Sequence, residues 1–218
     1  MTRPQPHQQS EEGASPLATQ DPDVDSGDQD IDAAGTDTHP LPASGSKRTP
    51  SLTAFLLSEL DREVDRTRRA LEYVPDDRGQ WKPHERSMGF GALSHMVATI
   101  PSWIAMIVSK NELDIDPAEG ASMPQQGPLT SAALLEALDT ASADARTALS
   151  GTTDGHLHGM WRLKARGNVV QQAPRFQMIQ DTFNHWAHHR GQMTVYLRLM
   201  DAHVPAIYGP SADEVSFR

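Results

Sequence analysis

The residues best suited to chemistry are histidines near the carboxyl-terminal end of the chain. His185, His188 and His189 lie within five consecutive positions. On a helix, residues four apart share a face, so His185 and His189 can point at one metal ion, whereas His188 lies ~100° away from His189. Two imidazoles at this spacing are a known kind of metal clamp. We therefore expect His185 and His189 to be ligands and give His188 a surface or supporting role.

A third histidine, His95, offers a further nitrogen from a distant part of the chain. A lone histidine in an apolar helix is more often a hydrogen-bonded core residue than a ligand. Together with His185 and His189, however, it completes the minimum set for a three-histidine site between two helices. Three neutral nitrogens leave coordination positions open for water or substrate. The chain has no cysteine, and imidazole alone does not distinguish zinc, nickel, iron and cobalt, so we expect one divalent metal ion of unassigned identity.

Three neighbours of the paired histidines are candidates for supporting roles. Asp181 could accept the second ring N–H of a ligand histidine, or it could merely cap the polar side of the helix. Arg190 could bind an anionic group of a substrate, or it could form an exposed ion pair. Gln192 could contact a metal-bound water or a neighbouring backbone group. The stripe that carries Asp181, the histidine pair and Gln192 is expected to face inward, where polar groups are costly unless paired or liganded.

Apolar residues recur at helical spacing in four stretches that must position these side chains. The first begins at Thr49-Pro50, with Thr49 as the expected N-cap and Pro50 as the first helical residue, and it ends before Pro75. The second begins between positions 88 and 91 and continues to about position 107. Pro101 falls inside this second pattern, so a kink is expected near position 97.

A third helix is expected to start at Thr130, and a fourth follows Pro174. Residues 111–129 have no periodic apolar pattern and are expected to form a loop. Residues 152–173 suit either a short hairpin or an extended crossover, and the pattern does not choose between them. The final residues, 205–218, are expected to form an irregular arm. The expected fold is therefore all-α, a four-helix bundle with long connections.

Residues 1–48 differ from the rest of the chain in composition. They carry a net charge of -6, more than half of the chain's -10, and few large apolar side chains. We predict a disordered acidic tail over residues 1–48 and a single domain over residues 49–218. The absence of a basic stripe argues against nucleic acid as a partner. There is no secretory signal, transit peptide or apolar run near the ~20 residues that span a bilayer, so a cytoplasmic protein is expected.

Several of these segments resemble the DinB superfamily of metal-binding four-helix bundles, of DinB/YfiT-like type, which includes the bacillithiol- and mycothiol-dependent transferases. The resemblance rests on His95 within Leu-Ser-His-Met and on the run His-Trp-Ala-His-His-Arg-Gly-Gln-Met over residues 185–193. Residues 81–88 and 208–214 also look like one branch of the family, and the resemblance covers about residues 50–215. It implies a divalent metal bound by His95, His185 and His189, and frequent homodimers.

Two functions are compatible with these features. In the first, the metal activates a small thiol or water, giving a thiol (S-)transferase or a related detoxification or isomerisation enzyme. In the second, the protein is a non-enzymatic metal-binding homodimer in a stress response. An enzyme should have an accessible pocket with oriented polar groups above the metal, whereas a structural site should be covered by apolar side chains. No phosphate-binding glycine loop, serine elbow or paired-carboxylate motif occurs, which weakens nucleotide-dependent and simple hydrolase alternatives.

Overall fold

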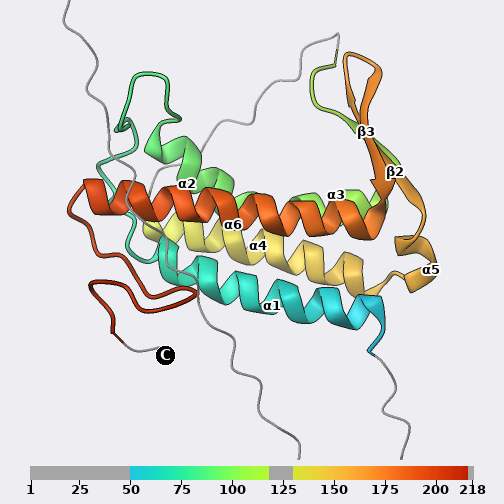
Figure 1. Cartoon of the computed structure of the whole chain (residues 1–218), viewed down its shortest axis with the longest axis horizontal. Coiled ribbons are helices and arrows are strands. Elements are labelled where there is room, and N and C mark those ends of the chain that lie inside the picture. The colour runs from blue at the N-terminus through green and yellow to red at the C-terminus, as the bar shows by residue number, and fades with distance from the viewer. Residues whose placement is uncertain (1–49, 118–129, 216–218) are drawn as a thin grey trace, which may run out of the picture. The chain divides into compact units, whose positions relative to one another are not determined.

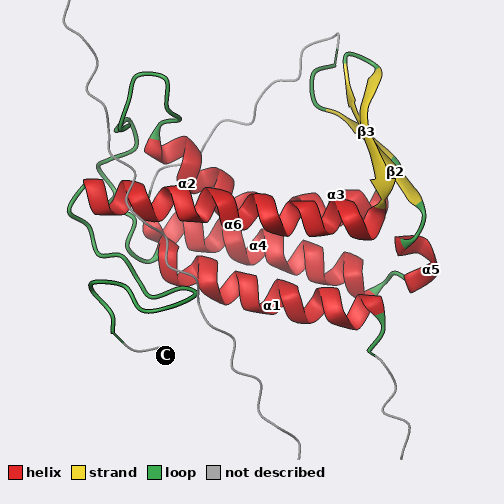
Figure 2. Cartoon of the chain, in the orientation of Figure 1, coloured by secondary structure: helices red, strands yellow, loops and turns green. Residues whose placement is uncertain are grey.

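The computed structural model describes residues 50–117 and 130–215, so the tail expected over residues 1–48 lies outside the described residues. The described part is mostly helical and contains one small sheet (Figures 1 and 2). Its elements, in chain order, are α1 (Leu52–Leu71), α2 (Phe90–Thr99), α3 (Pro101–Ser109), β1 (Glu112–Asp114), α4 (Ser131–Ser150), α5 (Asp154–Leu157), β2 (Met160–Ala165), β3 (Asn168–Pro174) and α6 (Arg175–Leu199).

The first helix begins later than Thr49-Pro50 would suggest. Its N-cap is Ser51, whose hydroxyl accepts a hydrogen bond from the backbone N–H of Ala54 (3.1 Å). A hydroxyl at this position satisfies one of the free N–H groups of the first turn, which fixes the start of the helix there. The start expected for the third helix at Thr130 agrees with α4, because Thr130 is the N-cap of that helix and its hydroxyl accepts from the backbone N–H of Ala133 (3.1 Å).

The second expected helix is divided into α2 and α3, whose axes differ by 48°. The break is at Ile100 rather than near position 97, and Pro101 stands at the start of α3. Proline lacks a backbone N–H and is therefore tolerated in the first turn of a new helix better than inside an existing one. No single helix in the described ranges is long and apolar enough to cross a membrane, although α2 and α3 together pass that test by length and composition.

Most of the described residues are helical, as expected, but they also include a three-stranded sheet that the all-α class did not foresee. β2 and β3 form an antiparallel hairpin, which is one of the two alternatives for residues 152–173, and β1 pairs with β2 in parallel. β1 lies in the segment that was expected to be a loop. Because it has three residues and finds its partner about fifty positions later, it leaves no periodic pattern of its own. Figure 1 shows the hairpin where α3 ends and α6 begins.

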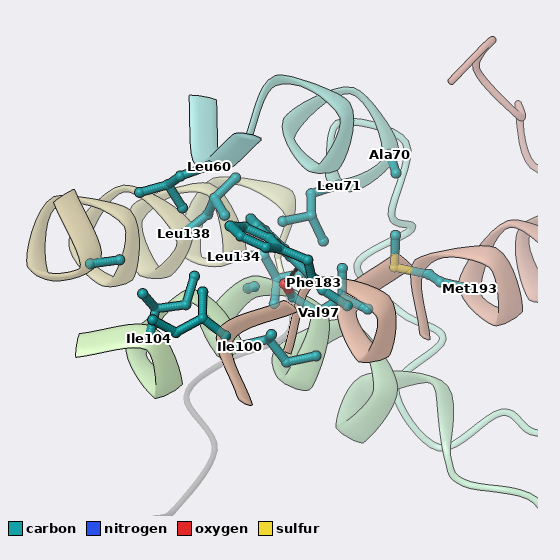
Figure 3. Close-up of a cluster of buried hydrophobic side chains, with 14 of the residues drawn as sticks. Leu60, Ala70, Leu71, Val97, Ile100, Ile104, Leu134, Leu138, Phe183 and Met193 are labelled. Atoms are coloured by element: carbon teal, nitrogen blue, oxygen red, sulfur yellow. Dashed lines mark hydrogen bonds between the residues drawn. The ribbon is translucent and has the colours of Figure 1, made fainter. Parts of the chain in front are cut away.

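The core lies between α1, the bent pair α2–α3, α4 and α6. Figure 3 shows side chains from these helices meeting in one cluster, among them Leu60 of α1, Ile104 of α3, Leu138 of α4 and Phe183 of α6. All four are buried. Burial of apolar side chains on this scale is the main force that holds the helices in fixed positions, and α6 is the helix that carries the paired histidines.

Residues 205–215 contain no helix or strand, as expected for the carboxyl-terminal arm. Glu214 fastens this arm to the helices. Its carboxylate accepts from the Arg69 guanidinium (2.9 Å) and from the backbone N–H of Ala206 (3.0 Å), and it lies 3.0 Å from Nε2 of His203. These contacts hold the pKa of Glu214 at about 2, and the hydrogen bond with His203 makes the largest contribution.

Candidate metal centre

His185 and His189 lie one turn apart on α6, and their rings are adjacent. The ring centroids are 4.4 Å apart and the planes are inclined by 72°. His185 is exposed and His189 is half-buried, so the pair is reachable from solvent. His188 is also exposed, with its ring centroid 5.2 Å from that of His189.

Gln192 orients the second ring of this pair. Its side-chain carbonyl oxygen lies 2.8 Å from Nδ1 of His189. Because this oxygen can only accept, the hydrogen bond assigns the proton to Nδ1 and leaves the lone pair on Nε2. A ligand histidine needs this arrangement, in which one ring nitrogen is fixed by a neighbour and the other is free for a metal ion. Gln192 therefore supports His189 in the way that was considered for Asp181.

His185 is held in a setting that favours its neutral form. Partial burial lowers its pKa first, and the charges that His189 and His188 would carry lower it further. The Trp103 ring lies beside it, with a centroid separation of 5.2 Å. A neutral imidazole retains the lone pair that metal coordination requires. The local electrostatics thus suit His185 to be a ligand.

His95 lies half-buried on α2, the helix that runs beside α6. Two hydrogen bonds show that the helices run in opposite directions: the Trp186 indole N–H donates to the Val97 carbonyl (2.7 Å), and the Tyr196 hydroxyl donates to the Met88 carbonyl (3.4 Å). His95 lies between these two contacts, and so does the second histidine of the α6 pair. The fold therefore brings the helix that bears His95 alongside the paired histidines.

The three candidate ligands do not form a complete cluster in the described ranges. There, no three histidine, aspartate or glutamate side chains are grouped closely enough to hold a metal ion. The structure brings His185 and His189 together and leaves His95 on the adjacent helix. The donor chemistry nevertheless fits a divalent ion, because the pair offers two imidazoles on a rigid helix, one of which an amide orients.

A pocket of about 330 Å³ opens beside His185. Its lining combines α3, the three-stranded sheet and α6: Trp103, Met106, Ile107, Leu113, Ile115, Trp161, Leu163, Gln171, Met178, Asp181, Thr182 and His185. The sequence did not predict this pocket, because one of its walls is the unforeseen sheet. The alternation of Trp161 and Leu163 on β2 was the available signal, since residues two apart on a strand face the same side.

Asp181 lines this pocket near His185 but has a different partner from the expected one. Its carboxylate accepts from the Gln171 side-chain N–H (3.1 Å), and within the described residues no hydrogen bond joins it to either paired histidine. The expectation that the polar stripe faces inward is wrong, because Asp181, His185 and Gln192 are all exposed. The opposite side of α6 is the buried one, since Trp186 and its neighbours fill the core.

Arg190 is buried, so the alternative of an exposed ion pair is wrong, and the contact with an anionic substrate group stays a prediction. Its guanidinium pairs with the Glu63 carboxylate, donates to the Thr67 hydroxyl (2.8 Å) and contacts the Tyr208 hydroxyl. Burial raises the pKa of Glu63, but the charge and hydrogen bonds of Arg190, aided by Arg66, lower it by more. Arg190 therefore ties α6 to α1 and to the carboxyl-terminal arm, and does not reach the pocket beside His185.

Comparison with known proteins agrees with this architecture. The profile of the DinB family matches residues 50–216. The uncharacterized protein YrdA of Bacillus subtilis (strain 168) is 30% identical over 158 residues, which cover 70% of this chain and 85% of YrdA. A DinB-like protein from Bacillus cereus ATCC 10987 has a similar fold, with a TM-score of 0.55 and 22% identity over 70% of this chain and 95% of that one.

A second solved structure has a comparable fold. The DinB-like protein YjoA from Bacillus subtilis gives a TM-score of 0.53 and 18% identity, and the match covers 69% of this chain and 96% of YjoA. At these identities the two solved structures bear on the fold alone. The match to the family profile spans all the described residues, and the chain belongs to the DinB family.

Proposed function

We propose that this chain binds one divalent metal ion through His95, His185 and His189 and acts as a metal-dependent thiol transferase or a related detoxification enzyme. The supporting observation is the adjacent ring pair of His185 and His189, 4.4 Å apart, at the edge of a pocket of about 330 Å³. An open pocket next to the exposed imidazole of His185 is what a reactive site needs, because substrate must reach the nucleophile. Membership of a family that includes thiol-dependent transferases also supports the proposal of a thiol transferase.

The side chains around the proposed site have separable tasks. Gln192 fixes the ring of His189, and the Trp186 hydrogen bond to α2 fixes how α6 lies against the helix that bears His95. Asp181 and Thr182 bring polar atoms to the pocket on the same helix as His185. A divalent ion held by the histidines would supply Lewis-acid activation of a thiol or water nucleophile. The protein would contribute position, orientation and a largely apolar chamber.

The competing proposal is a non-enzymatic metal-binding homodimer that acts in a stress response. It would require the space beside the histidines to be covered by apolar side chains. The pocket at His185 favours the enzyme instead. We further propose that α1, α2–α3, α4 and α6 form a four-helix bundle of the family type and that the protein works as a homodimer, which sedimentation equilibrium would test.

The metal content of variants tests the ligand assignment directly. The full chain is purified without chelator and its metal is quantified by elemental analysis, together with His95→Ala, His185→Ala and His189→Ala. We expect about one ion per chain in the wild type and loss of stoichiometric metal in each variant. His188→Ala is the matched control, because this exposed neighbour should leave the metal content unchanged. Metal retained by a folded His185→Ala/His189→Ala double variant would overturn the site.

Activity is tested separately once the metal content is known. Metal-loaded protein is mixed with a panel of small thiols and electrophiles, and product formation is compared with the same concentration of free metal. Acceleration that His185→Ala abolishes and His188→Ala preserves would support a transferase. If no pair of substrates reacts faster than with free metal, the non-enzymatic alternative replaces the enzyme.

A further inference from the structure

The pocket beside His185 has a wall made by one row of side chains across the sheet. Leu113 of β1 stands opposite Leu163 of β2, and Leu163 stands opposite Gln171 of β3. All three line the pocket. Residues paired across strands point to the same side of a sheet, so this row forms a continuous surface that ends in an amide.

The other two walls are helical and complete an enclosure of mostly apolar side chains. On α3, Trp103, Met106 and Ile107 follow the three- and four-residue spacing of one helix face. On α6, the lining follows the same spacing and ends at His185, so the proposed metal site lies at one edge of the pocket. The Trp161 ring forms part of the sheet wall, and its indole N–H has no partner among the described residues.

The charge and size of the pocket restrict what it can hold. Among the described residues that line the pocket, Asp181 is the single acidic one and none is a lysine or arginine. Anionic molecules are therefore disfavoured by a carboxylate in a largely apolar setting. A volume of about 330 Å³ is at the lower end of the ~300–1,000 Å³ found for small-molecule sites. This size suits a molecule of up to three aromatic rings.

We propose that the chamber between α3, the sheet and α6 is the binding subsite for an uncharged, apolar or aromatic acceptor substrate, which it holds beside His185. This inference rests on the proposed function for its catalytic meaning, but binding of the apolar molecule itself requires no metal. Trp103 places its indole ring against the ligand from α3, and Trp161 does so from the sheet, next to the row from Leu113 to Gln171. Asp181 selects against acidic compounds.

A matched pair of fluorescent probes tests this proposal. N-phenyl-1-naphthylamine is neutral, and 8-anilinonaphthalene-1-sulfonate has the same rings with an added sulfonate. Each is titrated into the full chain, with and without metal, while probe emission and tryptophan fluorescence are recorded. We expect the neutral probe to bind at one site per chain and to quench Trp103 and Trp161. The sulfonate should bind at least tenfold more weakly, and Asp181→Asn should narrow that difference.

Two variants on the hairpin localise the binding. Leu163→Glu introduces a charge into the sheet wall and should weaken binding of the neutral probe at least tenfold. Val170→Glu is its matched control, because Val170 is an exposed apolar residue of the same hairpin that does not line the pocket. Equal affinity of wild type and Leu163→Glu, or equal weakening in both variants, would overturn the proposal. Tighter binding of the sulfonate than of the neutral probe would also overturn it.

The outcome is independent of the metal site. If the metal-free protein binds the neutral probe but the metal-loaded protein catalyses no thiol transfer, the subsite is supported and the proposed enzyme activity is refuted. If metal-loaded wild type and metal-loaded Leu163→Glu catalyse thiol transfer equally well, the enzyme activity is supported and the subsite is refuted.

Discussion

Arg190 allows a sharp test of how α6 is held in place. In Arg190→Met the Glu63 carboxylate loses its main partner while remaining inside the protein. The side chains of Arg190 and Glu63 are 1% and 5% exposed, so water cannot replace the lost contact. Thr67 and Tyr208 lose a donor in the same step. The substitution preserves much of the volume, so the effect reports the charge rather than a cavity.

The expected cost follows from this burial. Removing one partner of a buried ion pair typically costs ~3–5 kcal/mol, because the remaining charge is left uncompensated. Arg66 still pairs with Glu63, which places the expected loss near the lower limit of that range, about 3 kcal/mol. The total free energy of unfolding of a domain is typically ~5–15 kcal/mol, so the expected loss is a large fraction of it. The Arg190→Met/Glu63→Met double variant should lose less free energy of unfolding than the two single variants lose in sum. The difference should be ~1 kcal/mol or more.

The pH dependence has a defined sign. In the wild type the pKa of Glu63 lies below its usual value, so the contribution of the pair is present above pH ~4.5 and is lost as pH falls below it. In Arg190→Met only Arg66 still lowers the pKa of Glu63, so burial raises that pKa relative to the wild type. The Glu63 carboxyl group can then take up a proton in mildly acidic solution. The difference in free energy of unfolding between wild type and Arg190→Met should therefore be smaller at pH 5 than at pH 7.

Urea denaturation followed by circular dichroism measures these differences. Arg146→Met is the control, since it removes the Arg146–Asp61 pair, in which both side chains are half exposed. An exposed pair is worth ~0–1 kcal/mol, so this control should stay near wild type. If Arg190→Met unfolds within ~0.5 kcal/mol of wild type, or if the double variant shows simple additivity, the ion pair does not hold α6 as argued.

Two further predictions concern the start of α6 and the carboxyl-terminal arm. Arg175 is buried and donates to the carbonyls of Ile107 (3.1 Å) and Met160 (3.2 Å), and the first of these contacts is buried. Arg175→Met removes the donor to the Ile107 carbonyl away from water, so it should lower the free energy of unfolding, measured by urea denaturation, by ~1–3 kcal/mol. Stability within ~0.5 kcal/mol of wild type would refute this role. Glu214 has a pKa of about 2, so its contribution is present above pH ~4.5 and is lost as pH falls towards 2. Glu214→Gln should therefore lower Tm at pH 7 and have little effect near pH 2, and an equal effect at both values would contradict the fastening of the arm.

The parts of the fold that the sequence predicted correctly are those encoded locally. Helix α1 and helix α6 each carry a repeated apolar pattern over many turns, and Thr130 is an N-cap hydroxyl that acts on a group three residues away. The adjacency of His185 and His189 is local in the same sense, because a four-residue spacing on a helix brings two rings together without help from the rest of the chain.

The parts that were predicted wrongly depend on long-range contacts. Which face of α6 is buried is decided by where α1 and α2 pack, and the partners of Arg190 lie 127 positions earlier and 18 positions later in the chain. Arginine side chains are most often exposed. The position of Arg190 in the sequence therefore gave no indication that it would pair with a buried carboxylate. The inward stripe was inferred from neighbouring apolar residues, which bury the opposite side of the helix instead.

The same division separates the two halves of the proposed site. The ligand donors come from helices, whereas the chamber beside them depends on β1 pairing with β2 across about fifty residues. Changes in the sheet can therefore alter which molecule binds while the helices that carry His95 and the α6 pair stay in place. A charge at Leu163 should change ligand binding and leave metal content unchanged, and a lost imidazole at His185 should do the reverse. If both properties were lost together in each variant, the helices and the sheet would form one cooperative site rather than a metal centre with a separate chamber.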